Sequence, residues 1–227
     1  MLPKITHVIF DMDGLLLDSE RIYTEVTQEI AQRYGKNFTW DIKVQLMGRT
    51  QAKSNEIALK LMDLPMTPEE YATETRRLQQ EKFKHVALMP GAERLVRHLH
   101  RHGIPICVAS GSAKYNYDIK VTNYQDLFGL FHHVVLGSDP EVKRCKPDPD
   151  AFLVAASRFD NPPADPENVL VFEDAVHGVA ASCAAKMPVV MVPDPRMDPE
   201  HFKKATLVLK SLEEFKPEEF GLPPFDE

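Results

Sequence analysis

The chain has 227 residues, of which 43% are hydrophobic and 27% are charged, and its formal net charge is −7. These proportions are typical of a globular protein, and the length suffices for one large domain or for a core with a smaller domain inserted into it. The charges form no long run of one sign, so the sequence argues against a nucleic-acid-binding surface and against an anionic membrane as a partner. A small anionic substrate is not excluded, because a pocket needs only a few local cations.

No apolar stretch approaches the roughly 20 residues that cross a bilayer, and residues 1–10 hold only a short apolar run without the cleavage site of a signal peptide. The three cysteines are widely spaced and odd in number, which is not typical of a disulfide framework. Cys107 lies in a β-like run and Cys183 in an alanine-rich helical stretch, so we expect both thiols to be buried and reduced. We therefore expect a cytoplasmic protein. We also expect the protein to be a monomer.

Short runs of apolar and β-branched residues alternate with helical stretches along most of the chain. Near-continuous apolar strands between helices are typical of a parallel sheet that is covered on both faces. Residues 90–103 and 148–159 carry apolar stripes at helical spacing, with Gly103 as a C-terminal cap and Pro149 in a first turn. The predicted fold class is α/β, a doubly wound, Rossmann-like parallel sheet. The expected strands are His7–Phe10, Ile104–Ala109, His133–Leu136, Val169–Phe172, Val189–Val192 and Thr206–Leu209.

The interval 17–83 interrupts this alternation, because it reads as consecutive helices without a convincing strand. Apolar residues recur at helical spacing from Ile22 to Tyr34, and the segment Thr67-Pro68-Glu69-Glu70 has the pattern of a capping box with proline in the first turn. We therefore predict two domains, a core formed by residues 1–16 and 87–227 and a helical domain of residues 17–86 inserted after the first strand.

Polar residues follow several of the predicted strands at the points where those strands end. Ligands of a doubly wound sheet bind beyond the carboxyl ends of its strands, so these residues should converge at one edge. Together with a lysine just ahead of the helix at 148–159, they supply several carboxylates, a hydroxyl beside a glycine, and one ammonium group. The residues in question are Asp11, Asp13, Ser110, Gly111, Lys146, Glu173 and Asp174.

This set of groups favours phosphoryl transfer. Asp11 and Asp174 offer hard oxygen ligands for Mg²⁺, and a cation is needed to keep clustered carboxylates ionised together. Lys146, the Ser110 hydroxyl and the Gly111 backbone N–H could bind the phosphoryl oxygens. One carboxylate can attack phosphorus to form an aspartyl-phosphate, and a second carboxyl two residues on can transfer protons. Each of these segments alone is common in proteins as a turn, a loop, a helix start or a solvated pair of carboxylates. A functional site is favoured only by the order of the segments along the chain and by their placement after predicted strands.

In this order the motifs resemble those of the haloacid dehalogenase superfamily, and the resemblance covers essentially the whole chain. The four motifs correspond to Phe10-Asp11-Met12-Asp13-Gly14, Ser110, Lys146-Pro147-Asp148-Pro149, and Phe172-Glu173-Asp174-Ala175 followed by Gly178. The resemblance implies that Asp11 is the nucleophile and that Asp13 is the general acid and base.

The same resemblance implies a Mg²⁺ site and a phosphate site. The metal would be held by the Asp11 carboxylate, the Asp13 backbone carbonyl and Asp174, with Glu173 close by or acting through water. The phosphoryl group would be bound by Ser110 and Lys146.

The helical domain resembles the family's mobile cap, which closes over the substrate and excludes water. Arg49, in Met47-Gly48-Arg49-Thr50, either reaches the substrate from this cap or is a surface arginine, and the sequence leaves both readings open. Segments outside the catalytic motifs, residues 135–142 and 220–223, resemble phosphatases of pseudouridine 5'-phosphate. We therefore expect the substrate to be a small phosphorylated metabolite, pseudouridine 5'-phosphate.

Three alternatives to this function stay open. A related phosphatase could act on glycerol 3-phosphate or on a deoxysugar phosphate. β-Phosphoglucomutases share these motifs and the cap, but they carry a cap histidine near the place where this sequence has Tyr23, which favours hydrolysis. A non-enzymatic binding protein with the same fold is disfavoured, because all the catalytic side chains are present.

Three histidines, His98, His100 and His102, lie on the helix predicted at 90–103, whose apolar stripe includes Leu95 and Leu99. His98 and His102 have the spacing of a metal-binding pair on one helix face. No carboxylate in the neighbouring sequence supports such a site. We therefore expect these histidines to form a solvated face.

Overall fold

Two compact units make up the protein. The computed structural model describes residues 4–47 and 51–226 of the chain. Contacts between residues divide the chain into one unit of Met1–Leu17 and Leu88–Glu227 and a second unit of Asp18–Ala87. The assignment of these units as a catalytic core and a mobile cap stays a prediction.

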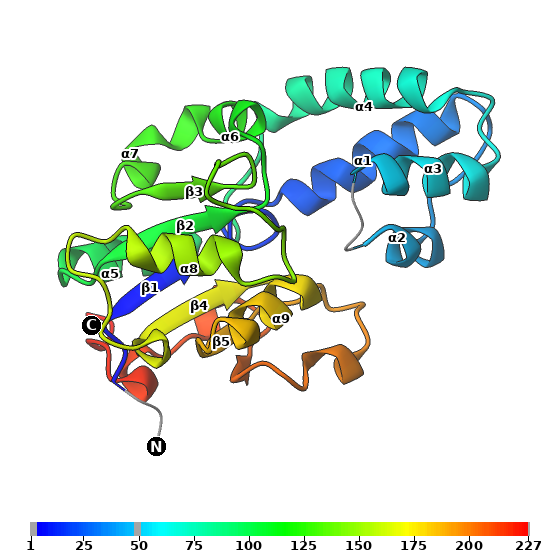
Figure 1. Ribbon diagram of the computed structural model, residues 1–227. Coiled ribbons are helices and arrows are strands. Elements are labelled where there is room, and N and C mark those ends of the chain that lie inside the picture. Colours follow the sequence, from blue (N-terminus) through cyan, green and yellow to red (C-terminus); the bar gives the residue numbers. More distant parts are fainter. Residues whose placement is uncertain (1–3, 48–50, 227) are drawn as a thin grey trace. The chain divides into compact units, whose positions relative to one another are not determined.

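A six-stranded sheet forms the centre of the larger unit (Figure 1). Its strands lie in the order β3-β2-β1-β4-β5-β6, and every neighbouring pair is parallel. This confirms the predicted α/β, doubly wound parallel sheet, and each strand overlaps one of the predicted runs. The strands are β1 His7–Phe10, β2 Ile106–Ser110, β3 Val134–Leu136, β4 Val169–Glu173, β5 Val189–Met191 and β6 Leu207–Val208.

The strand order places a topological switch at β1. Phe10, the last residue of β1, is in register with Val108 of β2 and with Phe172 of β4. The chain runs from β1 through β2 to β3 on one side and then adds β4, β5 and β6 on the other. The carboxyl ends of β1, β2 and β4 therefore meet at the edge where ligands of such sheets bind.

The helices of the larger unit lie between these strands in sequence, so α and β elements alternate as the sequence predicts. The described α-helices are α5 Ala92–Arg101, α6 Lys114–Lys120, α7 Gln125–Phe128, α8 Asp150–Ser157 and α9 Val176–Ala184. Short 3-10 helices lie at η1 Thr122–Tyr124, η2 Pro166–Asn168, η3 Pro199–Phe202, η4 Leu212–Glu214 and η5 Pro217–Phe220.

Side chains from both faces of the sheet are buried. Successive residues of a strand point to opposite faces, and Ile9 packs in a buried cluster with Phe152 of α8 and Val179 of α9. The neighbouring Phe10 is also fully buried and stacks on Phe172 with ring centroids 5.0 Å apart. This burial on both faces explains why the strands read as continuous apolar runs.

The smaller unit consists of helices in the part of it that the structure describes. Helix α1 (Ser19–Gln32) contacts α4 (Pro68–Phe83), and α3 (Gln51–Met62) contacts both α4 and α2 (Trp40–Leu46). Ile22, Val26 and Ile30 are buried, as their spacing predicts. Tyr34 does not continue this stripe, because α1 ends at Gln32, and its side chain is exposed.

The predicted capping box at the start of α4 is confirmed. The Thr67 hydroxyl accepts the Glu70 backbone N–H at 3.2 Å, and a carboxylate oxygen of Glu70 accepts the Thr67 N–H at 2.8 Å. These two bonds satisfy donors that a helix start otherwise leaves unpaired. Among the described residues of both units, no helix is long and apolar enough to cross a membrane.

One prediction about the cysteines is wrong. Cys107 is buried, as expected, but Cys183 is exposed. The reason lies in the orientation of α9, which buries Val179 and Ser182 and turns Cys183 away from the core.

The predicted solvated face of α5 is also wrong at one of its histidines. His98 is completely buried, whereas His100 and His102 are exposed. The C-terminal segment covers His98, because the His98 Nε2 donates to the Pro223 carbonyl oxygen at 2.9 Å and the ring lies 4.6 Å from the Phe225 ring. This contact joins residues more than a hundred positions apart in the sequence, which no local pattern predicts.

His133, next to β3, makes the stability of the fold depend on pH. Burial lowers the pKa of its imidazole from the usual 6.5, although the hydrogen bond that Nε2 donates to the Ala155 carbonyl at 2.9 Å acts in the opposite direction. As the pH falls through about 6.5, the unfolded chain binds a proton before the folded protein does, so the free energy of unfolding decreases.

We therefore expect His133→Gln to reduce the loss of stability on acidification, since glutamine can donate to the same carbonyl but does not titrate. Urea unfolding of the wild type and the variant at pH 7.5 and pH 5.5 measures this. The difference in unfolding free energy between the two pH values should be smaller in the variant. Equal differences in the two proteins would contradict the assignment of this effect to His133.

Candidate active site

Lys146 links two carboxylates at the carboxyl edge of the sheet. Asp11 directly follows β1, and Glu173 is the last residue of β4. The Lys146 Nζ lies 2.5 Å from Asp11 Oδ1, 2.6 Å from Glu173 Oε1 and 3.0 Å from the Ala109 carbonyl oxygen. An ammonium group has three N–H donors, so these acceptors use all of them. The charge of Lys146 is thereby fixed between the ends of β1, β2 and β4.

The charges around Asp11 determine how easily it ionises. Burial raises the pKa of Asp11 to about 7, the Lys146 ammonium acts to lower it, and the Glu173 and Asp13 carboxylates act to raise it. Burial alone would lower the pKa of Lys146, but the carboxylates of Asp11 and Glu173 outweigh this effect and raise it. Lys146 is therefore charged at neutral pH, and further positive charge beside Asp11 would favour the ionised carboxylate.

Three carboxylates lie close enough together to share a metal ion. One oxygen each of Asp11, Glu173 and Asp174 lie within 4.8 Å of one another, and Asp11 and Glu173 are buried. A set of carboxylate oxygens without nitrogen or sulfur suits a hard cation such as Mg²⁺. These residues therefore fit the ion that the sequence predicts. The expected participation of the Asp13 backbone carbonyl stays a prediction.

Glu173 is positioned by backbone donors and by a glycine. Its Oε2 accepts the N–H groups of Asp174 and Ala175, each at 3.1 Å, at the start of α9 where such donors lack partners within the helix. A Cβ added at Gly178 would lie 1.8 Å from Glu173 Oε1. The helix therefore approaches the carboxylate so closely that only glycine leaves room for it.

Asp13 has a separate set of partners. The Ser110 hydroxyl donates to Asp13 Oδ2 at 3.1 Å and the Ser112 hydroxyl donates to the same oxygen at 2.7 Å, while Lys120 Nζ donates to Oδ1. Lys120 is buried, and its Nζ also lies 3.0 Å from the Ser112 oxygen. Both carboxylate oxygens of Asp13 thus accept hydrogen bonds, which fix the orientation of the carboxylate.

The sequence motifs assign no role to Ser112 or to Lys120. Ser112 has one sequence signal, its place two residues after Ser110 in the loop that follows β2. Lys120 ends the helical stretch of α6, where a lysine is usually solvated. Only the fold brings its ammonium to Asp13, 107 positions earlier in the chain.

The loop after β2 is packed against the loop after β3. Gly137 donates its N–H to the Ser112 carbonyl oxygen at 3.1 Å. A Cβ added at Gly137 would lie 2.4 Å from the Gly111 carbonyl oxygen. This backbone contact places the hydroxyls of Ser110 and Ser112 beside Asp13. The predicted binding of a phosphoryl group by the Gly111 N–H stays a prediction, and Arg49 lies outside the described residues.

The same residues fall within a known family model. The model described as haloacid dehalogenase-like hydrolase matches residues 5–185, a range that includes every carboxylate and lysine of the site. The chain belongs to the haloacid dehalogenase-like hydrolases. This confirms the resemblance and the enzyme class predicted from the sequence.

Relatives of this hydrolase match nearly its whole length. The chain is 50% identical to (DL)-glycerol-3-phosphatase 2 of Arabidopsis thaliana over 226 residues, which cover 99% of this chain and 94% of the relative. It is 49% identical to the Drosophila melanogaster protein named "Probable pseudouridine-5'-phosphatase", also over 226 residues, which cover 99% of this chain and 97% of that relative. A solved HAD family hydrolase from Deinococcus radiodurans, with bound phosphate and sodium, matches with a TM-score of 0.80 and 26% identity over 97% of this chain and 99% of that chain.

The contact at Gly178 gives a test of the site geometry. In an open helix position, alanine in place of glycine stabilises a protein by about 1 kcal/mol. In Gly178→Ala the added methyl group must instead displace the Glu173 carboxylate from Lys146. We therefore expect a lower melting temperature and at least ~10-fold weaker Mg²⁺ binding, by analogy with the loss of a group that orients a metal ligand.

Thermal unfolding and calorimetric Mg²⁺ titration measure the two effects. Ala184→Ser, at an exposed position of the same helix, serves as the control and should leave both quantities close to wild type. Unchanged Mg²⁺ affinity in Gly178→Ala would show that the position of Glu173 does not matter for the metal.

Proposed function

We propose that this hydrolase is a Mg²⁺-dependent phosphomonoesterase in which Asp11 is the nucleophile. The observation that carries the proposal is the contact of one ammonium group, Lys146, with the buried carboxylates of both Asp11 and Glu173 at the switch point of the sheet. A cation and carboxylates in this arrangement suit the charge that a phosphoryl group carries during transfer. The two relatives described above, both named as phosphatases, support the same reaction class.

In the first step an Asp11 carboxylate oxygen attacks phosphorus, and the bond from phosphorus to the alcohol oxygen breaks. The leaving oxygen takes a proton from Asp13, and Lys146 offsets negative charge next to the attacking carboxylate. A Mg²⁺ ion held by Asp11, Glu173 and Asp174 would supply further positive charge to the phosphoryl oxygens and keep Asp11 ionised.

In the second step Asp13 takes a proton from water, which attacks the aspartyl-phosphate and releases inorganic phosphate. Hydrogen bonds from Ser110, Ser112 and Lys120 hold the Asp13 carboxylate for this task. The same aspartate therefore gives a proton in the first step and regains one in the second, so the enzyme returns to its starting state.

Paired variants at the two aspartates separate their roles. We expect phosphate release by Asp11→Asn to fall below detection, because an amide cannot form the acyl phosphate. In Asp13→Asn we expect a loss of kcat of ~10²- to 10⁴-fold, the range for removal of a general acid or base. Asp126→Asn, at an exposed aspartate that pairs with Arg97, is the matched control. Release at the wild-type rate by Asp11→Asn would rule out this nucleophile.

For the substrate we propose pseudouridine 5'-phosphate first and glycerol 3-phosphate second. Residues 135–142 and 220–223 support the first, together with the Drosophila relative at 49% identity. The Arabidopsis relative at 50% identity supports the second. Both compounds carry the phosphomonoester that Asp11 and Lys146 would meet, so the distinction must come from contacts to the rest of the molecule. Arg49 is our candidate for one such contact.

A phosphate-release assay with Mg²⁺ over a substrate panel tests this choice. We expect the highest kcat/KM for pseudouridine 5'-phosphate, and a lower value for uridine 5'-monophosphate, which differs only in the bond between base and ribose. Glycerol 3-phosphate and sugar phosphates complete the panel, and glucose 1-phosphate isomers also report sugar isomerisation by a mutase. A profile led by glycerol 3-phosphate or by sugar phosphates would reject the first substrate while leaving the reaction class intact.

We further propose that the enzyme works as a cytoplasmic monomer on a small phosphorylated metabolite. The three cysteines are free, and two of them, Cys145 and Cys183, are exposed. Exposed free thiols suit a reducing compartment. The net charge of −7 without a basic run supports a small-molecule partner rather than a nucleic acid.

A further inference from the structure

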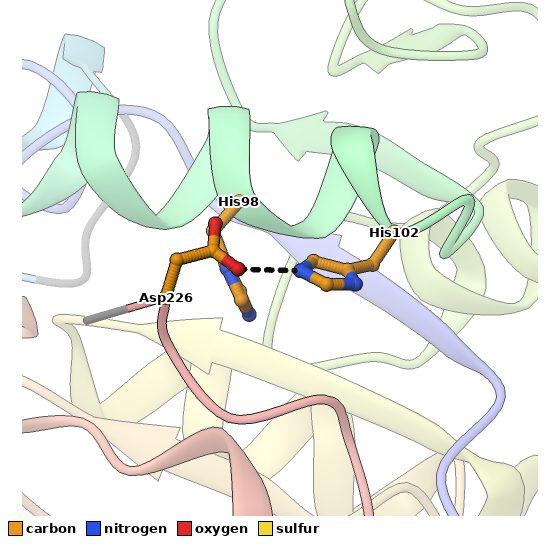
Figure 2. A group of neighbouring side chains, drawn as sticks. All are labelled: His98, His102 and Asp226. Carbon is orange, nitrogen blue, oxygen red and sulfur yellow. Dashed lines mark ion pairs between the residues drawn. The ribbon is translucent and has the colours of Figure 1, made fainter.

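A second group of side chains of the types that bind metals lies apart from the carboxylates of the active site. His98 and His102 are one turn apart on α5, and Asp226 comes from the C-terminal segment (Figure 2). One ring nitrogen of each histidine and one carboxylate oxygen of Asp226 lie within 4.8 Å of one another. The spacing of the two histidines can be seen in the sequence. The Asp226 carboxylate lies beside them only in the folded protein.

The hydrogen bonding of His98 leaves one of its nitrogens with a lone pair. A carbonyl oxygen can only accept a hydrogen bond, so the Nε2 that lies 2.9 Å from the Pro223 oxygen carries the proton. In a neutral imidazole the other nitrogen, Nδ1, is then unprotonated. This Nδ1 is buried and has no hydrogen-bond partner among the described residues. A buried acceptor without a partner is costly, and a metal ion would satisfy it.

This bonding pattern is that of metal-bound histidines, which usually donate the second ring N–H to a carbonyl or carboxylate oxygen that fixes the tautomer. The hydrogen bond from His98 Nε2 to the Pro223 carbonyl oxygen has this form. The rings of His98 and His102 have their centroids 4.5 Å apart, and one nitrogen of each ring lies within 4.8 Å of the other.

The spacing of the other two ligands matches a tetrahedral site. Ligand atoms about 2.1 Å from a tetrahedral ion lie ~3.4 Å from one another. His102 Nε2 lies 3.4 Å from Asp226 Oδ1, the contact that Figure 2 marks with a dashed line. Arg101 binds the second oxygen of Asp226, Oδ2, at 3.0 Å. That ion pair engages Oδ2, whereas Oδ1 is the oxygen that lies next to His102.

We propose that His98, His102 and Asp226 form a binding site for Zn²⁺. Two imidazole nitrogens and one carboxylate oxygen are a ligand set that zinc accepts. The exposure of His102 and Asp226 leaves room for water as a fourth ligand. The bound ion fastens the C-terminal segment to α5. This site differs in chemistry from Asp11, Glu173 and Asp174, whose oxygen-only set suits Mg²⁺.

The test uses the full chain without a histidine tag and with saturating Mg²⁺. Equilibrium dialysis against Zn²⁺ gives the number and affinity of the sites, and Co²⁺ in place of Zn²⁺ reports tetrahedral coordination by its visible absorption. We expect one zinc ion per chain in the wild type. His102→Asn and Asp226→Asn should each weaken this binding by at least ~10-fold, since each removes a ligand.

His100→Asn is the matched control, because His100 lies on the same helix but its Nδ1 bonds the Leu130 carbonyl oxygen at 3.1 Å instead. This variant, and Asp11→Asn in the active site, should retain the zinc ion. The variants in His102 and Asp226 change exposed side chains, so they should fold. Either of two results would overturn the proposal, namely a wild-type chain that binds no zinc under these conditions or equal affinity in His102→Asn, Asp226→Asn and His100→Asn.

Discussion

The contact of Lys146 with Asp11 and Glu173 is the interaction on which the rest of the site depends. Two carboxylates buried at the ends of β1 and β4 would repel each other, and a buried charge without a partner is costly. One ammonium group offsets only part of this negative charge, and Asp174 adds a third carboxylate. The remaining negative charge is what makes the cluster suited to a divalent cation. Gly178 completes the arrangement by giving Glu173 the space that any side chain would fill.

The fold and most of this cluster could be predicted from the sequence because the signals are local. The runs at His7–Phe10 and Val169–Phe172 predict strands, and Asp11 follows the first run directly, as Glu173 and Asp174 follow the second. Parallel strands with a switch in their order then bring those residues together. What the sequence missed depends on contacts between distant segments. From the sequence alone Lys120 and His98 would both be expected to face solvent. In the fold, Lys120 instead contacts Asp13, and the C-terminal segment covers His98.

The substrate is the part of the function that these local signals do not specify. In the mechanism that we propose, Asp11, Asp13 and Lys146 act on the phosphoryl group, which every phosphomonoester carries, so they are compatible with several substrates. The two relatives at 50% and 49% identity differ in the substrate that their names give, although both match nearly the whole chain. Selection therefore depends on side chains that contact the alcohol part of the substrate. The smaller unit, with Arg49 in its segment outside the described residues, is where we expect them.

Covalent phosphorylation of Asp11 can be detected directly by quenching the enzyme with borohydride during turnover and mapping the chain by mass spectrometry. Borohydride reduces an acyl phosphate to an alcohol, so a phosphorylated aspartate is converted to homoserine. We predict homoserine at position 11, in the presence of both substrate and Mg²⁺, with Asp13 unmodified. Reduction at a different carboxylate, or an unmodified Asp11 while phosphate is being released and the reaction is quenched before substrate is exhausted, would contradict the proposed nucleophile.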